Sequence, residues 1–571
     1  MASRRHADAA VRGTDPYGAC RRRGTATRRW PTIERVPCDH ASGGPCGGRW
    51  CIPPFVRDPD HVAATTTVAA EVASVVLPAL LAEHLRGIAR EHHAACPSGP
   101  SEAKRVTQLG ALVPRVMYPG SWAEAARHAG AEPLWTGRSR AYDASTLRQV
   151  ATRLDAEGCS ERVANVVWNQ VERAVEAGGE EVIAYTDMFD PPYYTKKLAH
   201  AAPIGRLGNR ILAATYFGLT TIALPQGPTL FAHLSWHKPA APLGDGLEDR
   251  FAEDARLAWW HDHVRLHIVD RGANGDRILG WCLDWDVPYL TIGRQSADLW
   301  RFRTPTYQTA RGKPIVVRPD TRLEGTASDG PWEVIVPANP DDPDATRGLR
   351  FRSAVECTAD IVVELNAVYK SRWPSMENEI KALLSRGFGR NRTRKLELTT
   401  SRGVDGQLLR LDEREADLLA QIVTLNEEPV TRRNADKMRS MKRKVRKVRG
   451  LRARTQSGAT LKHARPEGGA ERLGKWLHLL TQNALALALY ASNDPAIRSM
   501  SATKVFDLLL GQPAIARVAP DHLTLWVEAV GSAADRRLQE SLVEVFNKLQ
   551  LRSLGSLIEI RLRQTLTAKG L

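Results

Sequence analysis

Three acidic residues stand where an α/β fold could bring them together. Asp187 lies near the end of the apolar run "EVIAYTDMF", Asp270 closes "VRLHIVD", and Glu377 lies in "YKSRWPSMENEIKALL", whose apolar residues recur at helical spacing. The ends of neighbouring strands present side chains at one edge of a sheet, and a helix packed there can supply one more. Three carboxylates suit Mg²⁺, with Mn²⁺ as a substitute, and a pair of such ions can drive phosphoryl displacement.

Two of these positions have neighbouring alternatives. Asp190 follows Asp187 closely, and Glu379 follows Glu377. We favour Glu377 because on a helix it shares a face with an aromatic residue and with Lys381. The same spacing also allows a simple ion pair between Glu377 and Lys381, worth roughly a few tenths of a kcal/mol.

Histidines and cysteines give weaker signals for a metal. The histidines of "HDHVRLH" alternate as residues on a strand do, a spacing that requires no metal: His261, His263 and His267. Residues near the N-terminus could form a small zinc site, but they include no CxxC pair. They are Cys20, Cys38, His40, Cys46 and Cys51. We expect these cysteines to be reduced and unconnected.

The composition favours a protein that handles a polyanion. Its 571 residues and 63.1 kDa exceed what one hydrophobic core usually supports, so several structural units are expected. Lys and Arg outnumber Asp and Glu by 80 to 64, and the formal net charge of +16 favours nucleic acid as the partner. The Arg-rich start lacks an apolar signal core, and the most apolar early stretch is interrupted by Glu71 and Pro78. We therefore expect a cytoplasmic protein without a membrane partner.

Four stretches together resemble the DDE transposases of bacterial insertion sequences, which share the RNase H-like fold with retroviral integrases. They are "YTDMFDPPYYTKK", "PIGRLGNRILAATY", "VDRGANGDRILGWCLDWDVPYLTIGR" and "YKSRWPSMENEIK". In that family the first Asp lies on the first strand, the second follows the fourth strand, and Glu lies on a helix after an optional insertion. The resemblance covers residues 180 to 390 and, more loosely, the helical tail.

The resemblance implies a function and a set of ligands. Asp187, Asp270 and Glu377 would hold two Mg²⁺ ions, and the enzyme would cleave DNA at transposon ends and transfer the strands into target DNA. It would act on double-stranded DNA, as a homodimer or larger assembly that pairs two ends, and it would associate with the nucleoid when bound.

One departure concerns the helix that carries the glutamate. Many relatives with an insertion carry the spacing Y-x2-R-x3-E-x6-K. Tyr369 and Arg372 fit, whereas Glu377 comes one residue late and Lys381 only four residues after it. Relatives with an "RW…EN…K" arrangement are closer. The resemblance implies that Tyr369, Arg372 and Lys381 contact DNA.

We predict a multidomain α/β protein with an RNase H-like mixed sheet, flanking helices, a β-rich insertion, and helical N- and C-terminal regions. The expected parts are a basic flexible arm (1–60), a helical domain that could bind DNA (61–178), the catalytic domain (179–299 and 356–395), the β-rich insertion (300–355) and a helical C-terminal region (396–571). Trp332, in the insertion, could stack on an extruded base, although a Trp in a strand is more often a core residue.

The C-terminal region contains a basic helix in "NADKMRSMKRKVRKVRGLRAR". Met438, Met441, Val445 and Val448 recur at intervals of three and four and form one narrow apolar seam. No acidic residue compensates the basic ones between residues 442 and 449, so a DNA-binding surface is favoured over a merely solvated face. The basic residues are Lys442, Arg443, Lys444, Arg446, Lys447 and Arg449.

Two other functions fit the same residues. The first is an RNase H-like metal-dependent nuclease that cuts DNA without strand transfer. The second is a DNA-binding protein descended from a transposase, with an idle metal site. Only the first of these would still need Asp270 for activity.

Overall fold

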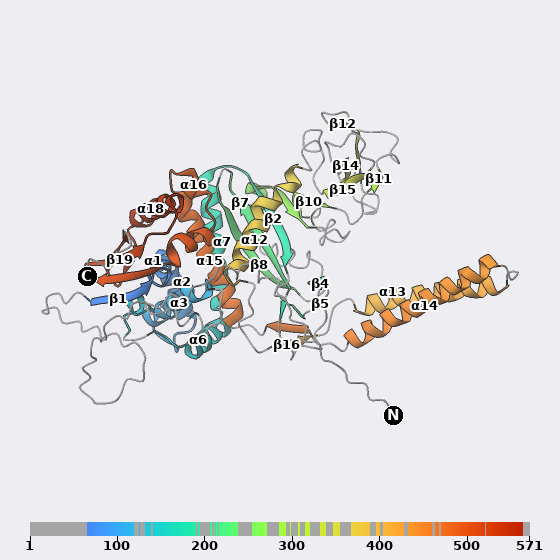
Figure 1. The fold of residues 1–571 in the computed structure, drawn as a ribbon, viewed down its shortest axis with the longest axis horizontal. Helices are drawn as coiled ribbons and strands as arrows, with labels where there is room; N and C mark the ends of the chain where they lie inside the picture. Colours follow the sequence, from blue (N-terminus) through green and yellow to red (C-terminus); the bar gives the residue numbers. More distant parts are fainter. Residues whose placement is uncertain are drawn as a thin grey trace, which may run out of the picture. The chain divides into compact units, whose positions relative to one another are not determined.

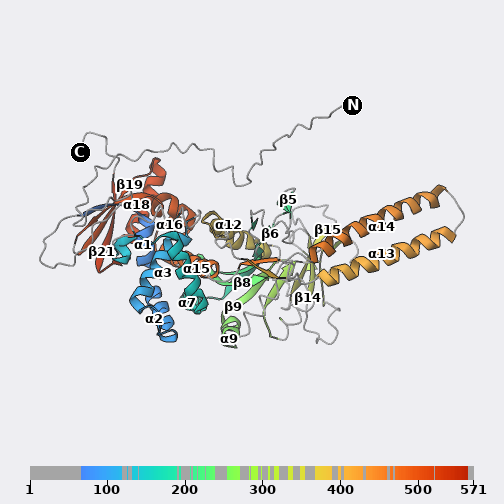
Figure 2. The ribbon, with the colours of Figure 1, turned by 90° about the horizontal axis from the view of Figure 1, so that it is seen from below.

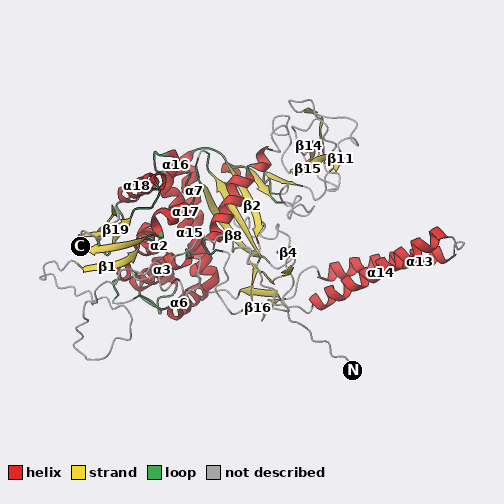
Figure 3. Cartoon of the chain, in the orientation of Figure 1, coloured by secondary structure: helices red, strands yellow, loops and turns green. Residues whose placement is uncertain are grey.

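A computed structural model gives the fold of the 571-residue chain (Figure 1). Helices and strands are both plentiful in the part of the chain that it describes, in agreement with a mixed α/β protein (Figure 3). The described residues are 66–118, 125, 132–138, 141–189, 192–193, 206–207, 210–211, 213–214, 216–225, 227–237, 254–270, 282, 285–292, 297–298, 307–308, 314–319, 332–337, 347–353, 367–388, 396–399, 404–427, 432–459, 463–466, 470–519 and 521–563.

Five strands, which we call the central five, form one side of the larger sheet in the spatial order β8-β7-β2-β9-β10, with β8 at the edge of the sheet. The first three strands along the chain, β2, β7 and β8, pair antiparallel, whereas β9 runs parallel to β2 and β10 runs parallel to β9. Their bounds are β2 (Val182–Phe189), β7 (Tyr216–Ala223), β8 (Thr229–His237), β9 (Val264–Val269) and β10 (Tyr289–Ile292). The helix α9 (Asp254–His263) precedes β9, as a crossover to a parallel strand requires.

The predicted insertion extends this sheet. β15 pairs antiparallel with β10, so that Ile292 lies opposite Phe351. Beyond β15 follow β14, β13 and β12, and a short β11 also pairs with β15. The β-rich segment is therefore continuous in hydrogen bonding with the central strands. These strands are β11 (Ala297–Asp298), β12 (Tyr307–Gln308), β13 (Pro314–Pro319), β14 (Trp332–Pro337) and β15 (Arg347–Ser353).

A second sheet has the order β1-β18-β19-β21-β20, and it corrects the prediction of helical N- and C-terminal regions. Along β19 the alternate residues Leu523, Leu525 and Val527 are buried, which is a strand pattern. Short apolar runs such as this one fit both helical and strand periods, so sequence alone assigned them wrongly. The strands are β1 (Thr66–Glu71), β18 (Pro513–Val518), β19 (His522–Glu528), β20 (Arg552–Ser553) and β21 (Ser556–Arg563).

The helix α15 (Ala470–Tyr490) is the centre of the helical part. It packs against α3, α6, α7 and β8, so the segments 61–178 and 396–571 share one core. The neighbouring helices are α1 (Val72–Leu80), α2 (Ala82–Ala95), α3 (Glu102–Val116), α5 (Pro133–Thr136), α6 (Ala144–Ala156) and α7 (Cys159–Gly178). Toward the C-terminus follow α16 (Pro495–Arg498), α17 (Ala502–Val505) and α18 (Ala533–Lys548). Within the described ranges no single helix is long and apolar enough to cross a membrane, and only α1 with α2, bent by 62°, passes that test as a pair.

Asn483 of α15 fastens the edge of the larger sheet. Its side chain is fully buried, and it accepts a hydrogen bond from the backbone N–H of Phe231 at 2.8 Å and donates one to the same residue's carbonyl at 2.9 Å. Phe231 lies on the edge strand β8, beside a register shift opposite Thr220 and Thr221. The amide therefore takes the place of a neighbouring strand.

Asn483→Ala should lower the free energy of unfolding by about 1–3 kcal/mol, because two buried backbone groups of Phe231 lose their partner. Chemical denaturation followed by circular dichroism measures this loss. Asn169→Ala, at an exposed position of α7, is the matched control and should leave the midpoint unchanged. Equal midpoints for the two variants would contradict the role given to Asn483.

Glu71 gives the second sheet a pH dependence. Burial raises the pKa of its carboxyl to about 8, from 4.5. The folded protein keeps this proton up to about pH 8, while the unfolded chain releases it above about pH 4.5. Stability should therefore fall as the pH rises between these two values, by roughly 2–4 kcal/mol.

Glu71→Gln should remove this fall, because glutamine carries no ionisable proton. Urea midpoints of the variant and the wild type should agree near pH 4 and differ most above pH 8, with the variant more stable. Glu91→Gln, at an exposed position of α2, should follow the wild type at every pH. A variant profile parallel to that of the wild type would refute the assignment to Glu71.

Candidate active site

Asp187 and Asp270 lie side by side where the pairing of the parallel strands β2 and β9 ends. Thr186 of β2 is in register with Val269 of β9, and each aspartate is the next residue along its own chain segment. The N–H of Asp270 donates a hydrogen bond to the carbonyl of Thr186 at 3.3 Å. The sheet thus places the two aspartates side by side, although β2 itself continues beyond Asp187 to Phe189, where it pairs with β7. Asp190, the alternative to Asp187, lies outside the described residues.

Glu377 reaches the same place through an unusual helical turn. Residues Trp373–Glu377 form a π-helical turn that continues into α12 (Asn378–Ser385). A π-helical turn brings residues five apart onto the same side, whereas an α-helix does so for residues four apart. Arg372 and Glu377 are five apart, and their side chains meet at 3.1 Å. The wider turn thus brings Arg372 and Glu377 together although they are five residues apart.

The three carboxylates converge on the guanidinium of Arg372. One terminal nitrogen, Nη1, lies 2.8 Å from Oδ2 of Asp187 and 3.4 Å from Oδ1 of Asp270, while Nη2 contacts Glu377. The Tyr369 hydroxyl donates to Oδ1 of Asp270 at 3.5 Å. Burial alone would lower the pKa of Arg372, but these neighbours together raise it above its usual value. Arg372 therefore stays positively charged at the centre of the cluster.

The remaining residues of this helix separate into two groups. Lys381 is exposed, and its Nζ lies 4.9 Å from the centre of the exposed Trp373 ring, so these two residues share a face as predicted. Glu377 pairs with Arg372 rather than with Lys381. Glu379 is not part of the cluster around Arg372, and burial raises the pKa of its carboxyl. The geometry therefore groups Glu377, and not Glu379, with the two aspartates.

Beneath the carboxylates lies a buried polar network that sequence reasoning missed. The Thr186 hydroxyl is 2.8 Å from Nε2 of His267 and 2.5 Å from the hydroxyl of Thr220. The only available signal was a threonine next to Asp187 in an apolar strand. The expectation that the histidines alternate on one strand is wrong, because His261 and His263 lie on α9 and only His267 lies on β9.

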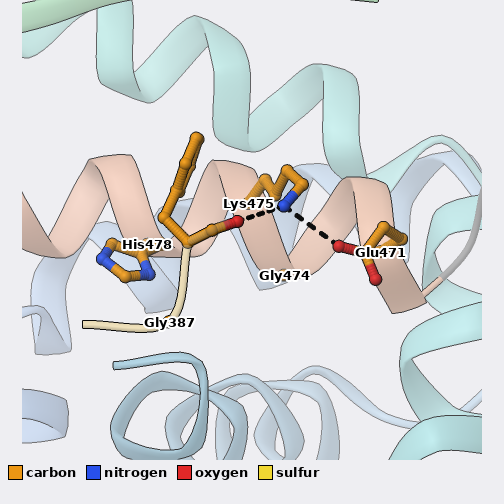
Figure 4. A pocket seen from close by; sticks show the side chains of 6 residues that line it. Gly387, Glu471, Gly474, Lys475 and His478 are labelled. Atoms are coloured by element: carbon orange, nitrogen blue, oxygen red, sulfur yellow. Dashed lines mark hydrogen bonds and ion pairs between the residues drawn. The ribbon is translucent and has the colours of Figure 1, made fainter. Parts of the chain in front are cut away.

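Lys475 of α15 binds the chain at the C-terminal end of α12, the helix that follows Glu377. Its Nζ donates to the carbonyl of Phe388, just beyond α12, and lies 3.0 Å from Oε1 of Glu471 (Figure 4). Both charged side chains are almost completely buried. They line a cavity of about 10 Å³, room for about one water molecule, together with Gly387, Gly474 and His478. This cavity is too small for a substrate, so its lining is a structural support.

The predicted basic helix is α14 (Arg432–Ala459), and it packs along α13 (Val404–Glu427) as a two-helix hairpin (Figures 1 and 2). Val445 and Val448 bury the predicted seam against Leu418. All six predicted DNA-binding side chains, Lys442, Arg443, Lys444, Arg446, Lys447 and Arg449, are exposed. However, Arg449 pairs with Glu415 of α13 at 2.6 Å, so the partner helix supplies compensating acids that the basic segment itself lacks.

The remaining residues that the sequence suggested for base stacking or zinc binding are described only in part or not at all. Trp332 begins β14, where its backbone lies opposite Pro319 and Ser353, and its side chain is outside what the structure describes. The N-terminal cysteines and His40 also lie outside the described residues. Among the described residues, the group of possible metal ligands whose donor atoms all lie within 4.8 Å of one another is His92, Cys96 and Glu157.

The arrangement at the strand ends can bind cations and anions together. Three carboxylates supply hard oxygen donors, while Arg372 and Lys381 supply positive charge within the same helix. No protein-family model matches the chain, and no curated protein matches it either.

Lys475→Met should destabilise the protein by about 3–5 kcal/mol, because it removes the cation beside the buried Glu471 carboxylate. Chemical denaturation of the variant measures this cost. The double variant Lys475→Met, Glu471→Leu should recover a large part of it, since no buried charge then remains at this pair. A double variant as unstable as the sum of the two single variants would show that the pair is not coupled.

Proposed function

We propose that this protein is a DNA transposase of the DDE type, which cleaves DNA at transposon ends and joins them to target DNA. The observation that carries the proposal is the meeting of Asp187, Asp270 and Glu377 around one guanidinium. These residues come from three distant segments, and a purely structural ion pair would need only one carboxylate. A site with three acids at a strand edge is suited to phosphodiester chemistry.

The order of the strands supports an RNase H-like catalytic domain. Along the chain, Asp187 lies on the first strand of the central five, β2, and Asp270 directly follows the fourth, β9. Glu377 then lies on a helix after the β-rich segment. The DDE transposases that the sequence resembles place their two aspartates and their glutamate at the corresponding elements.

The donor set fits Mg²⁺. Asp187, Asp270 and Glu377 would hold the ions through carboxylate oxygens, the ligand type that Mg²⁺ prefers. Bound Mg²⁺ would supply activation of the attacking hydroxyl and stabilisation of the leaving oxygen. The side chains of the three acids are 15%, 33% and 19% exposed, so a phosphodiester can approach them from solvent.

The chain's own cations would position the DNA. Lys381 is exposed on α12, four residues after Glu377, where it would neutralise a phosphate near the scissile bond. Tyr369 holds the carboxylate of Asp270 in place through its hydroxyl. The exposed basic residues of α14 would contact the DNA backbone at a distance from the site, and two copies would pair the transposon ends.

Cleavage assays on duplexes taken from the DNA that flanks the coding region, where the proposal expects inverted repeats, test this proposal. Asp270→Asn and Glu377→Gln should each lower cleavage by about 100-fold or more in Mg²⁺ or Mn²⁺, because each removes one carboxylate ligand. DNA binding, measured by gel shift, should stay within about threefold, because phosphate contacts elsewhere dominate affinity. Glu379→Gln is the matched control on the same helix and should cleave as the wild type does.

The same assay separates the competing functions. Equal cleavage of random duplex and of the repeat ends, without joined products, would indicate a nuclease and refute the transposase. Unchanged activity of Asp270→Asn would mean that the three acids do not perform phosphodiester chemistry.

A further inference from the structure

The guanidinium of Arg372 lies among the three carboxylates of the candidate site. Three carboxylates point at its guanidinium, with contacts of 2.8, 3.4 and 3.1 Å, and its side chain is 12% exposed. Carboxylates brought this close repel one another when ionised, unless a positive charge lies among them. The guanidinium is thus the common counter-ion of the three acids.

The way Arg372 is held differs from that of a structural arginine. Its contacts in the described chain are the three carboxylates and the ring of Tyr369, at 5.4 Å. Arg105, by contrast, is completely buried and donates to the carbonyls of Pro100 and Cys96 at 2.8 and 2.6 Å. The fold keeps the backbone carbonyls of Pro100 and Cys96 in contact with Arg105. The carboxylates that bind Arg372 belong to side chains, and these can bind a metal ion instead.

Arg105 lies against the group of possible metal ligands formed by His92, Cys96 and Glu157. Its Nη1 lies 3.5 Å from both Nε2 of His92 and Oε2 of Glu157, two of the atoms that could otherwise hold a metal. A divalent ion there would face a guanidinium that two backbone carbonyls hold in place. Arg372 has no such backbone partner among the described residues, and its side chain is 12% exposed, whereas that of Arg105 is completely buried.

We propose that Arg372 and divalent metal ions compete for the same three carboxylates. Arg372 acts as a built-in counter-ion that holds Asp187, Asp270 and Glu377 together, and it leaves the cluster when metal binds. Once released, its guanidinium faces the same edge as Lys381 and is suited to grip a DNA phosphate with two hydrogen bonds. The inference deepens the proposed function and rests on it, since it assumes that metal binds these acids.

Competition predicts whether removal of the Arg372 guanidinium strengthens or weakens metal binding. A residue that only orients the ligands would weaken metal binding when removed. A competing cation would do the opposite, because the metal no longer has to displace it. Loss of the guanidinium should also destabilise the protein in a chelator, since three neighbouring carboxylates then lose their counter-ion.

The experiment titrates the full-length protein with Mn²⁺ in the absence of DNA and follows free Mn²⁺ by electron paramagnetic resonance. Arg372→Ala should bind Mn²⁺ about tenfold more tightly than the wild type, which corresponds to about 1.4 kcal/mol. Arg372→Gln keeps most of the side-chain volume and should show the same tightening, so it decides the matter if the alanine variant folds poorly. Lys370→Ala, which removes an exposed cation two residues away, should bind as the wild type does.

The thermal midpoint gives a second readout. In a chelator both Arg372 variants should melt below the wild type, and Mn²⁺ should raise their midpoints by more than it raises that of the wild type. Unchanged or weaker Mn²⁺ affinity in both Arg372 variants would overturn the competition.

Asp270→Asn distinguishes this failure from failure of the proposed function. If Asp270→Asn loses Mn²⁺ binding while the Arg372 variants do not gain it, the metal site stands and only the competition is wrong. If Asp270→Asn binds Mn²⁺ as tightly as the wild type, the metal site and the competition both fall.

Discussion

Three carboxylates that share one edge of a sheet repel one another unless a positive charge lies among them, and most of the site is arranged to supply that charge. The parallel pair β2 and β9 fixes two of the acids, and the turn before α12 delivers the third together with Arg372. The far end of α12 is fastened in turn by Lys475 of the central helix α15. The placement of Glu377 thus also depends on α15, a helix that begins more than 80 residues after α12 ends.

Sequence reasoning located the acids but not the turn that unites them. Asp187 and Asp270 could be found because short apolar runs that end in an acid indicate strand ends at a common edge. The spacing of Arg372 and Glu377 was misleading, since side chains five apart do not face each other on an α-helix. A π-helical turn has no sequence signal that periodicity can detect. It is seen in the backbone, where the N–H of Asn378 donates to the carbonyl of Trp373, five residues earlier.

Pairing between segments far apart in the sequence accounts for the other differences between the predicted and the observed structure. β1 and β18 are far apart in the chain, and each has an apolar pattern short enough to fit a helix, so their joint sheet could not be foreseen. The charge of the basic helix was judged along its own segment, whereas its compensating acid, Glu415, lies on α13. Local patterns predict elements well, but charge balance and sheet order depend on which elements become neighbours.

The pairing of β1 with β18 also has a consequence for synthesis. Residues 66–71 leave the ribosome long before residues 513–518, so an early strand edge stays unpaired during most of translation. The helices that follow it lack α15 for the same interval. A nascent chain of this protein therefore depends on late contacts, and loss of its last quarter would leave its first folded segments without their core.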